Sequence, residues 1–450
     1  MQIKLIEYLK ERFKRKDNRL ILKNVISTFT LFVSRYIMQF LQYFYLLSVL
    51  GISNWGLLSF GTTFVLYFDI VIEYGFNFPA TRQVSVNTEN KEFLTEIYNA
   101  IMFARLMFVV ACAAVYFPII FTFSIFSNYW QVYTIFFAML IGYAITSGWF
   151  FQGMQKFTII TYNYIVSYLI YTICLVLFVH NSSDFVLASF FETLYIVMIG
   201  ILNVAIITRK FGIKLKFPSM KSVKKQLSEG YLLFFQGIAV LVYNYSSTFI
   251  LGLLTNNTIV GYYSSALVII TAASGFISTI TSVVFPRISK MVNESKEKSL
   301  VFIKRYFIFM LALAIAMFLG LLFFSDLLRW FLKIIGSKTD FTQAILVIKI
   351  ESILPVLIII DNTMFQIMIT YDYTKPLPKI YGAATALLIL LNFVFVPTFL
   401  HVGAAIIAVA AELFIATIEL IFLNKHGINI FSGMQKNIID ILENRKGESA

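Results

Sequence analysis

The sequence predicts an all-α integral membrane protein with about twelve transmembrane helices. Of its 450 residues, 59% are hydrophobic and only 13% are charged, whereas an average soluble domain has about 25% charged residues. The apolar residues form runs about 20 residues long, such as 306–324 and 383–400, which is the length of helix that crosses a bilayer. The two halves of the chain also carry related motifs at matching positions, which predicts two six-helix halves.

Apolar windows between polar segments define the individual helices, and each window is long enough to cross the membrane. The twelve predicted spans are 21–45, 56–80, 94–122, 129–152, 158–179, 185–208, 229–254, 261–286, 305–325, 342–369, 380–400 and 402–424.

The spans and the basic segments together predict the domain organisation. A basic linker at 209–228 separates an N-terminal half at 21–208 from a C-terminal half at 229–424. The tails at 1–20 and 425–450 combine basic residues with apolar residues at helical spacing, so we expect amphipathic helices on the membrane surface.

The distribution of basic residues predicts the orientation. The net charge is +13, which in a soluble protein would suggest nucleic-acid binding. Here 30 of the 36 Lys and Arg residues fall in the tails and even-numbered loops, and only three fall in the odd-numbered loops. By the positive-inside rule both termini face the cytoplasm, and the charge indicates topology rather than a nucleic-acid partner.

Cysteine and histidine exclude several kinds of site. Cys112 and Cys174 each lie inside an apolar run, and the three histidines lack the spacing of metal ligands. We therefore expect no disulfide framework, no metal site and no cofactor. No glycine-rich phosphate loop supports ATP hydrolysis either, so a proton or sodium gradient is the expected energy source.

An internal repeat relates the two halves. Gly56 follows Trp55 at the start of the second span, and Gly261 opens the eighth span 205 residues later. Pro79 and Pro286 close the same two spans and are 207 residues apart. Because six spans separate the copies, a pseudo-two-fold axis along the membrane normal should relate the halves, as in alternating-access transporters.

These motifs resemble a known family. Leu50-Gly51, Trp55-Gly56, the segment 74–82 and the Gly-Tyr-Tyr-Ser element at 261–264 are similar to the signature of Wzx-type polysaccharide flippases. Those proteins belong to the multidrug/oligosaccharidyl-lipid/polysaccharide (MOP) exporter superfamily. The resemblance implies ion-coupled translocation of an undecaprenyl-diphosphate-linked oligosaccharide to the outer leaflet of a bacterial inner membrane. A polysaccharide polymerase and glycosyltransferases are the partners that it implies.

Charges within the first three spans give the first set of candidate substrate residues. Arg35 and Gln39 share a face of the first span, and Asp69 and Glu73 share a face of the second. Counting residues from the loops places Arg35 at the depth of Asp69, and Glu73 at the depth of Arg105. The pairs either hold the helices together or form a cavity wall in which the two arginines bind a diphosphate.

The C-terminal half supplies further candidates. Gln236, Tyr243 and Asn244 on the seventh span are residue types that bind sugar hydroxyl groups. On the tenth span, Lys349 is either a substrate contact or a side chain that reaches the outer interface. Asp361 lies near the bilayer centre beyond a helix kink expected at Pro355, and we expect it to be the ion-coupling residue.

Two other functions fit parts of this pattern. A multidrug or small-cation exporter of the same superfamily would need an acidic, aromatic cavity, whereas this sequence mixes cations with acids. A membrane-embedded polysaccharide polymerase or ligase would need a large outer loop, and the longest here spans only residues 326–341. We therefore expect a transporter rather than an enzyme.

Overall fold

A computed structural model describes residues 16–334 and 341–430. The described residues form helices and contain no strand. The predicted surface helices of the tails lie almost wholly outside the described residues. The helices are α2 (Lys16–Glu73), α3 (Asn77–Val86), α4 (Lys91–Thr122), α5 (Ser124–Ser127), α6 (Trp130–Ile145), α7 (Gly148–Gly153), α8 (Phe157–Phe178), the 3-10 turn η1 (Ser182–Asp184), α9 (Phe185–Lys210), α10 (Met220–Leu254), α11 (Asn257–Glu294), α12 (Lys296–Ile334), α13 (Thr342–Glu351), α14 (Leu354–Thr370) and α15 (Leu377–Lys425).

Ten helical segments of the described chain are long and apolar enough to cross a membrane. Two of these are interrupted by a single non-helical residue. Gly51 has φ +77° inside α2, and Leu400 has φ +52° inside α15. The first break lies between the predicted spans 21–45 and 56–80, at a glycine that reaches positive φ without steric cost. The membrane class is confirmed, and the count of twelve spans in symmetric halves stays a prediction.

The chain divides into two compact units. Among the described residues, the first unit comprises those up to Leu50 together with Leu58–Leu241, and the second comprises Gly51–Leu57 together with those from Val242 onward. Each unit therefore includes a short piece of the opposite half of the sequence. The predicted division into halves at 21–208 and 229–424, with a basic linker at 209–228 between them, therefore stays a prediction.

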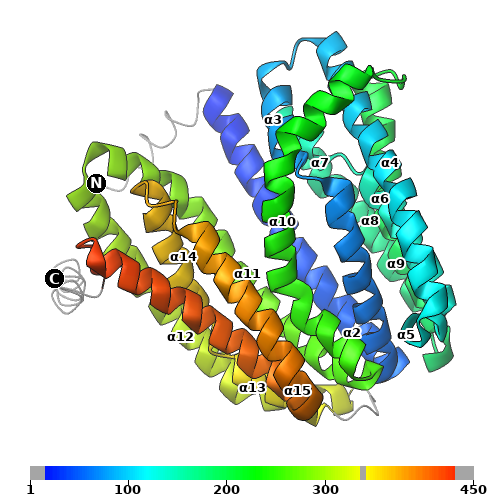
Figure 1. Ribbon diagram of the computed structural model, residues 1–450, viewed down its shortest axis with the longest axis vertical. Coiled ribbons are helices and arrows are strands. Elements are labelled where there is room, and N and C mark those ends of the chain that lie inside the picture. The colour runs from blue at the N-terminus through cyan, green and yellow to red at the C-terminus, as the bar shows by residue number, and fades with distance from the viewer. Residues whose placement is uncertain (1–15, 335–340, 431–450) are drawn as a thin grey trace. The chain divides into compact units, whose positions relative to one another are not determined.

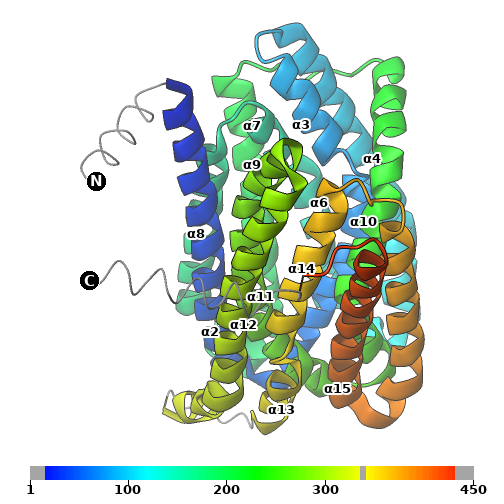
Figure 2. The same cartoon turned by 90° about the vertical axis from the view of Figure 1, so that its left-hand side faces the viewer.

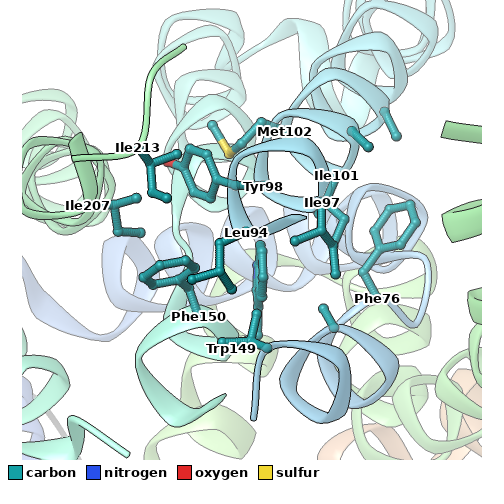
Figure 3. Packing of buried hydrophobic residues seen from close by; sticks show 14 of the residues in the cluster. Phe76, Leu94, Ile97, Tyr98, Ile101, Met102, Trp149, Phe150, Ile207 and Ile213 are labelled. Carbon is teal, nitrogen blue, oxygen red and sulfur yellow. The ribbon is translucent and has the colours of Figure 1, made fainter. Parts of the chain in front are cut away.

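The first unit packs its helices as a bundle. α6 lies against both α4 and α9, and α8 lies against α9 (Figure 1). Where α3, α4 and α7 meet, Trp149 and Phe150 of α7 pack against Leu94 and Tyr98 of α4 (Figure 3). These aromatic rings are fully or almost fully buried, and they fix the α7 segment that carries part of the candidate site.

The second unit is built around α14. This helix packs against α11, α12 and α15, and Figure 2 shows it between α12 and α15. The contacts of α14 are largely apolar, and Met364, Ile367 and Met368 are completely buried. The packing holds the polar residues of α14 in fixed positions relative to α15.

The repeated glycines found in the sequence meet in the second unit. A Cβ atom on Gly56 would overlap the backbone of Asn257, and one on Gly261 would overlap the carbonyl oxygen of Ile52. Both positions thus allow the 51–57 segment and the start of α11 to cross backbone against backbone. A side chain at either site would push the two segments apart.

We therefore expect Gly261→Ala to destabilise the protein, by about 1–3 kcal/mol as for other overpacked sites. The control is Gly320→Ala in α12, because an added Cβ there meets no atom within 4 Å. Thermal unfolding of both variants in detergent should show a lower midpoint for Gly261→Ala alone. Equal midpoints for the two variants would show that this crossing is not tight.

Candidate functional site

Two helix breaks in the first unit create a polar cavity. α2 ends at Glu73 rather than at residue 80, so the predicted end of the second span is wrong. Tyr74 (φ +45°) and Gly75 (φ +70°) are two consecutive residues in left-handed conformations, and α2 ends before them. α6 likewise ends at Ile145 and α7 begins at Gly148. These breaks free backbone and side-chain oxygens at membrane depth, which is tolerated where they line a cavity.

Arg105 of α4 donates hydrogen bonds to residues beside both helix breaks. Its Nη1 donates a hydrogen bond to the carbonyl oxygen of Thr146 (2.7 Å), and its Nη2 donates to Oδ1 of Asn77 (3.1 Å). Asn77 in turn donates from Nδ2 to Oε1 of Glu73 (2.5 Å). Glu73 and Arg105 therefore come together as predicted from their depth, but Asn77 connects them. Arg105 is only 3% exposed, and its Nε has no hydrogen-bond partner within the described residues.

The cavity has a volume of about 180 Å³. It contains one guanidinium, Arg105, and two carboxyl groups, Asp69 and Glu73. Its remaining lining residues are Asn77, Tyr143, Thr146, Gly148, Trp149 and Gln152. Asp69 has Glu73 and Arg105 as its charged neighbours. The site thus holds one buried cation, Arg105, with two carboxyl groups, Asp69 and Glu73, beside it. The Nε of Arg105 is still able to donate a hydrogen bond.

Arg35 does not join this site, so the predicted ion pair with Asp69 is wrong. Arg35 is exposed on α2, and its electrostatic neighbours are Tyr164, Tyr168 and Tyr195 of α8 and α9. The reason is the rotation of the helix: the face that carries Arg35 and Gln39 points toward these tyrosines. One helical turn on from the half-buried Gln39, Gln42 hydrogen-bonds Tyr168 and Tyr171.

A second polar site lies in the second unit, around Asp361. Tyr381 Oη donates to Oδ1 of Asp361 (2.8 Å). Glu412 and Glu419 of α15 are its acidic neighbours. Glu419 is completely buried, and Asp361 and Tyr381 are its hydrogen-bonding neighbours. Three carboxyl groups this close repel one another when charged, so the cluster requires a proton or another cation for balance.

Glu412 connects this cluster to the seventh predicted span. Tyr243 donates a hydrogen bond to Oε2 of Glu412. Asn244 is exposed next to it on α10, and Gln236 is exposed on the portion of α10 that belongs to the first unit. Tyr243 is therefore a neighbour of the acidic cluster, and its predicted contact with a sugar stays a prediction.

The predicted kink at Pro355 is confirmed, because α13 ends at Glu351 and α14 starts at Leu354. Glu351 is completely buried at this break beside Tyr263. Lys349 is directed elsewhere: its Nζ lies 2.7 Å from Oδ2 of Asp326, and both side chains are at least one-third exposed. This exposed ion pair gives Lys349 a partner at Asp326, and its predicted substrate contact stays a prediction.

The predicted site residues do not include Asn77, Thr146 and Gln152, because the second and fourth spans were predicted to be continuous helices. The signals were present as Tyr74-Gly75 and Ser147-Gly148, where glycine can end a helix. Glu412 and Glu419 were likewise not among the predicted site residues. Their spacing of seven residues places them on one face of α15, which is the signal that could have linked them.

Comparison with known proteins places the chain in a family. A family model described as "Polysaccharide biosynthesis protein" matches residues 21–292, more than half of the chain. The chain belongs to this family. Two relatives share the name "Putative O-antigen transporter". The one from Escherichia coli (strain K12) is 30% identical over 90% of this chain and 97% of its own. The one from Shigella dysenteriae is 24% identical, and the match covers 68% of this chain and 76% of that relative.

Solved structures show the same fold. An inward-facing multidrug resistance MATE family transporter of the MOP superfamily has a TM-score of 0.71 at 13% identity, covering 89% of this chain and 96% of that one. The lipid II flippase MurJ, in an inward closed conformation, has a TM-score of 0.68 at 15% identity, covering 89% and 87%. These structures show that the chain has a MOP-superfamily fold. Its family and the two relatives named above make it a multi-pass membrane transporter of the polysaccharide biosynthesis type rather than an enzyme.

Proposed function

We propose that this protein flips a polyprenyl-diphosphate-linked oligosaccharide from the cytoplasmic to the outer leaflet of a bacterial inner membrane. The observation that carries the proposal is the similarity to the Escherichia coli relative, which extends over 97% of that protein. The fold shared with a lipid II flippase supports it. Both termini face the cytoplasm in this proposal, consistent with the basic loops and tails.

Arg105 is the residue that we assign to the substrate diphosphate. It carries a charge into a cavity, and its Nε has no partner within the described residues. A guanidinium can exchange a carbonyl or amide contact for phosphate oxygens while it remains charged. Asp69 and Glu73 balance it when the substrate is absent. This exchange of partners gives reversible binding, which transport requires.

The acidic cluster of the second unit is the proposed coupling site. Asp361, Glu412 and Glu419 lie together where burial makes a full set of negative charges costly. A proton or a sodium ion bound by the cluster in one state, and released in the other, would link the gradient to alternating access. Tyr243 and Tyr381 hold two of the carboxyl groups in place.

Export of a small organic cation is the second candidate function. It is favoured by one observation, that the first-unit cavity contains two carboxyl groups and a single guanidinium. Uptake into inverted membrane vesicles separates the two functions. We expect no accumulation of a fluorescent cationic drug above vesicles that lack the protein. Gradient-driven drug accumulation that is abolished by Asp69→Asn would instead establish the exporter.

A further inference from the structure

A second cavity of the first unit, separate from the Arg105 site, lies between α3 and α10. Its volume is about 610 Å³. Arg82 of α3 and Lys225 of α10 contribute cations from opposite helices. The other lining residues are Phe78, Pro79, Gln83, Asn87, Phe93, Glu229 and Leu233. We call this cavity the α3–α10 groove.

Side-chain hydrogen bonds hold the two walls of the groove together. The amides of Gln83 and Gln226 hydrogen-bond each other reciprocally at 3.2 Å. Gln83 also donates from Nε2 to Glu229 Oε2 (2.5 Å). Gly75 and Gly230 bring the same two chain segments into backbone contact, since a Cβ on either would overlap the other segment. The groove is therefore fixed by the fold, and one oxygen of its one lining carboxylate, Glu229, accepts a hydrogen bond from Gln83.

The groove combines cationic and lipid-like surfaces. Arg82 and Lys225 are exposed, as expected for groups at the headgroup level of a membrane. Phe78, which also lines the groove, is 79% exposed. Leu232 and Phe235 lie outside the lining but on the same helix as the lining residue Leu233, and both are about two-thirds exposed. In a membrane-spanning chain, such apolar side chains contact acyl or prenyl chains. The surface thus fits an amphiphile that has an anionic head and a hydrocarbon tail.

We propose that the α3–α10 groove is a cytoplasmic loading site for the diphosphate head of the lipid-linked substrate. Two cations on opposite walls match a head with two phosphoryl groups, since each phosphoryl can take its own charge-assisted contact. The groove volume exceeds what a single phosphate needs and leaves room for a first sugar. The inference rests on the proposed function and adds a site at which the substrate binds before it reaches Arg105.

Binding of farnesyl diphosphate to the full-length protein in nanodiscs of neutral lipid tests this assignment. We expect the double variant Arg82→Gln/Lys225→Gln to raise the dissociation constant at least about tenfold, the effect of losing two charged hydrogen bonds. The matched control is Lys224→Gln, an exposed lysine next to Lys225 that does not line the groove. It should bind as the wild type does. The exchange variant Arg82→Lys/Lys225→Arg keeps both charges and should bind within a few-fold of the wild type.

Two competing ligands separate the possible sources of the anion. Farnesyl phosphate should compete weakly, and phosphatidylglycerol should not compete at equal concentration. Equal competition by phosphatidylglycerol would overturn the assignment in favour of a general anionic-lipid site. Equal affinity of the double variant and the wild type would overturn it outright. If the wild type binds the diphosphate here but flips no lipid-linked glycan, the proposed function fails and the groove remains a binding site.

Discussion

We expect the replacement of Arg105 with glutamine to abolish transport of the lipid-linked glycan. The substitution removes the cavity's one cation and leaves Asp69 and Glu73 with no opposing charge in it. Leaving a buried charge without its partner costs about 3–5 kcal/mol, so the variant should also unfold at a lower temperature. Flipping in proteoliposomes and the thermal midpoint in detergent measure the two effects.

A second variant separates loss of function from loss of folding. Arg105→Gln combined with Glu73→Gln removes one of the two uncompensated acids and should recover most of the thermal midpoint. It should not recover flipping, because the guanidinium that we assign to the diphosphate is still absent. Recovery of transport together with stability would show that Arg105 only neutralises its neighbours, which is the structural alternative that the sequence left open.

Asp361→Asn is expected to uncouple transport from the ion gradient. The amide keeps the size of the side chain and can still accept a hydrogen bond from Tyr381, but it cannot bind a proton or balance a sodium ion. Flipping driven by an imposed proton or sodium gradient should therefore fall to the rate seen without a gradient. The measurement is the ratio of these two rates in the variant and in the wild type.

Glu351→Gln is the matched control for this experiment. Glu351 is a buried carboxyl group of the same unit, but Tyr263 is its neighbour and it does not belong to the Asp361 cluster. Its substitution should leave the gradient dependence intact. If Asp361→Asn kept full gradient dependence while Glu351→Gln lost it, the coupling site would lie at the α13–α14 break instead.

Much of the fold follows from local properties of the sequence. Apolar runs define the membrane helices, Pro355 divides the tenth span, and Gly51 interrupts α2. Counting residues from a loop also brought Glu73 and Arg105 to one depth, because the rise per residue of a helix is constant. The repeated glycines Gly56 and Gly261 lie where the 51–57 segment crosses the start of α11. The sequence pattern predicted that the two glycines correspond, but it did not predict that their segments touch.

The failures have a common physical cause. Depth along a helix follows from residue number, but the direction of a side chain depends on how each helix is rotated against its neighbours. Arg35 and Asp69 have similar depth and still point to different partners. Helix breaks at membrane depth are also hard to predict, since a single positive-φ residue such as Tyr74 is stabilised by tertiary packing. Asn77 and Thr146 entered the site only through such breaks.

Flipping by the purified protein alone tests whether this chain translocates a lipid-linked glycan. Proteoliposomes would carry a fluorescent oligosaccharide linked to a polyprenyl diphosphate, and a membrane-impermeant quencher would report the fraction in the outer leaflet. We predict that the wild-type protein, under an imposed proton or sodium gradient, moves the labelled lipid faster than protein-free liposomes and that Arg105→Gln/Glu73→Gln does not. A folded wild-type protein that moves no labelled lipid under either gradient would contradict the account.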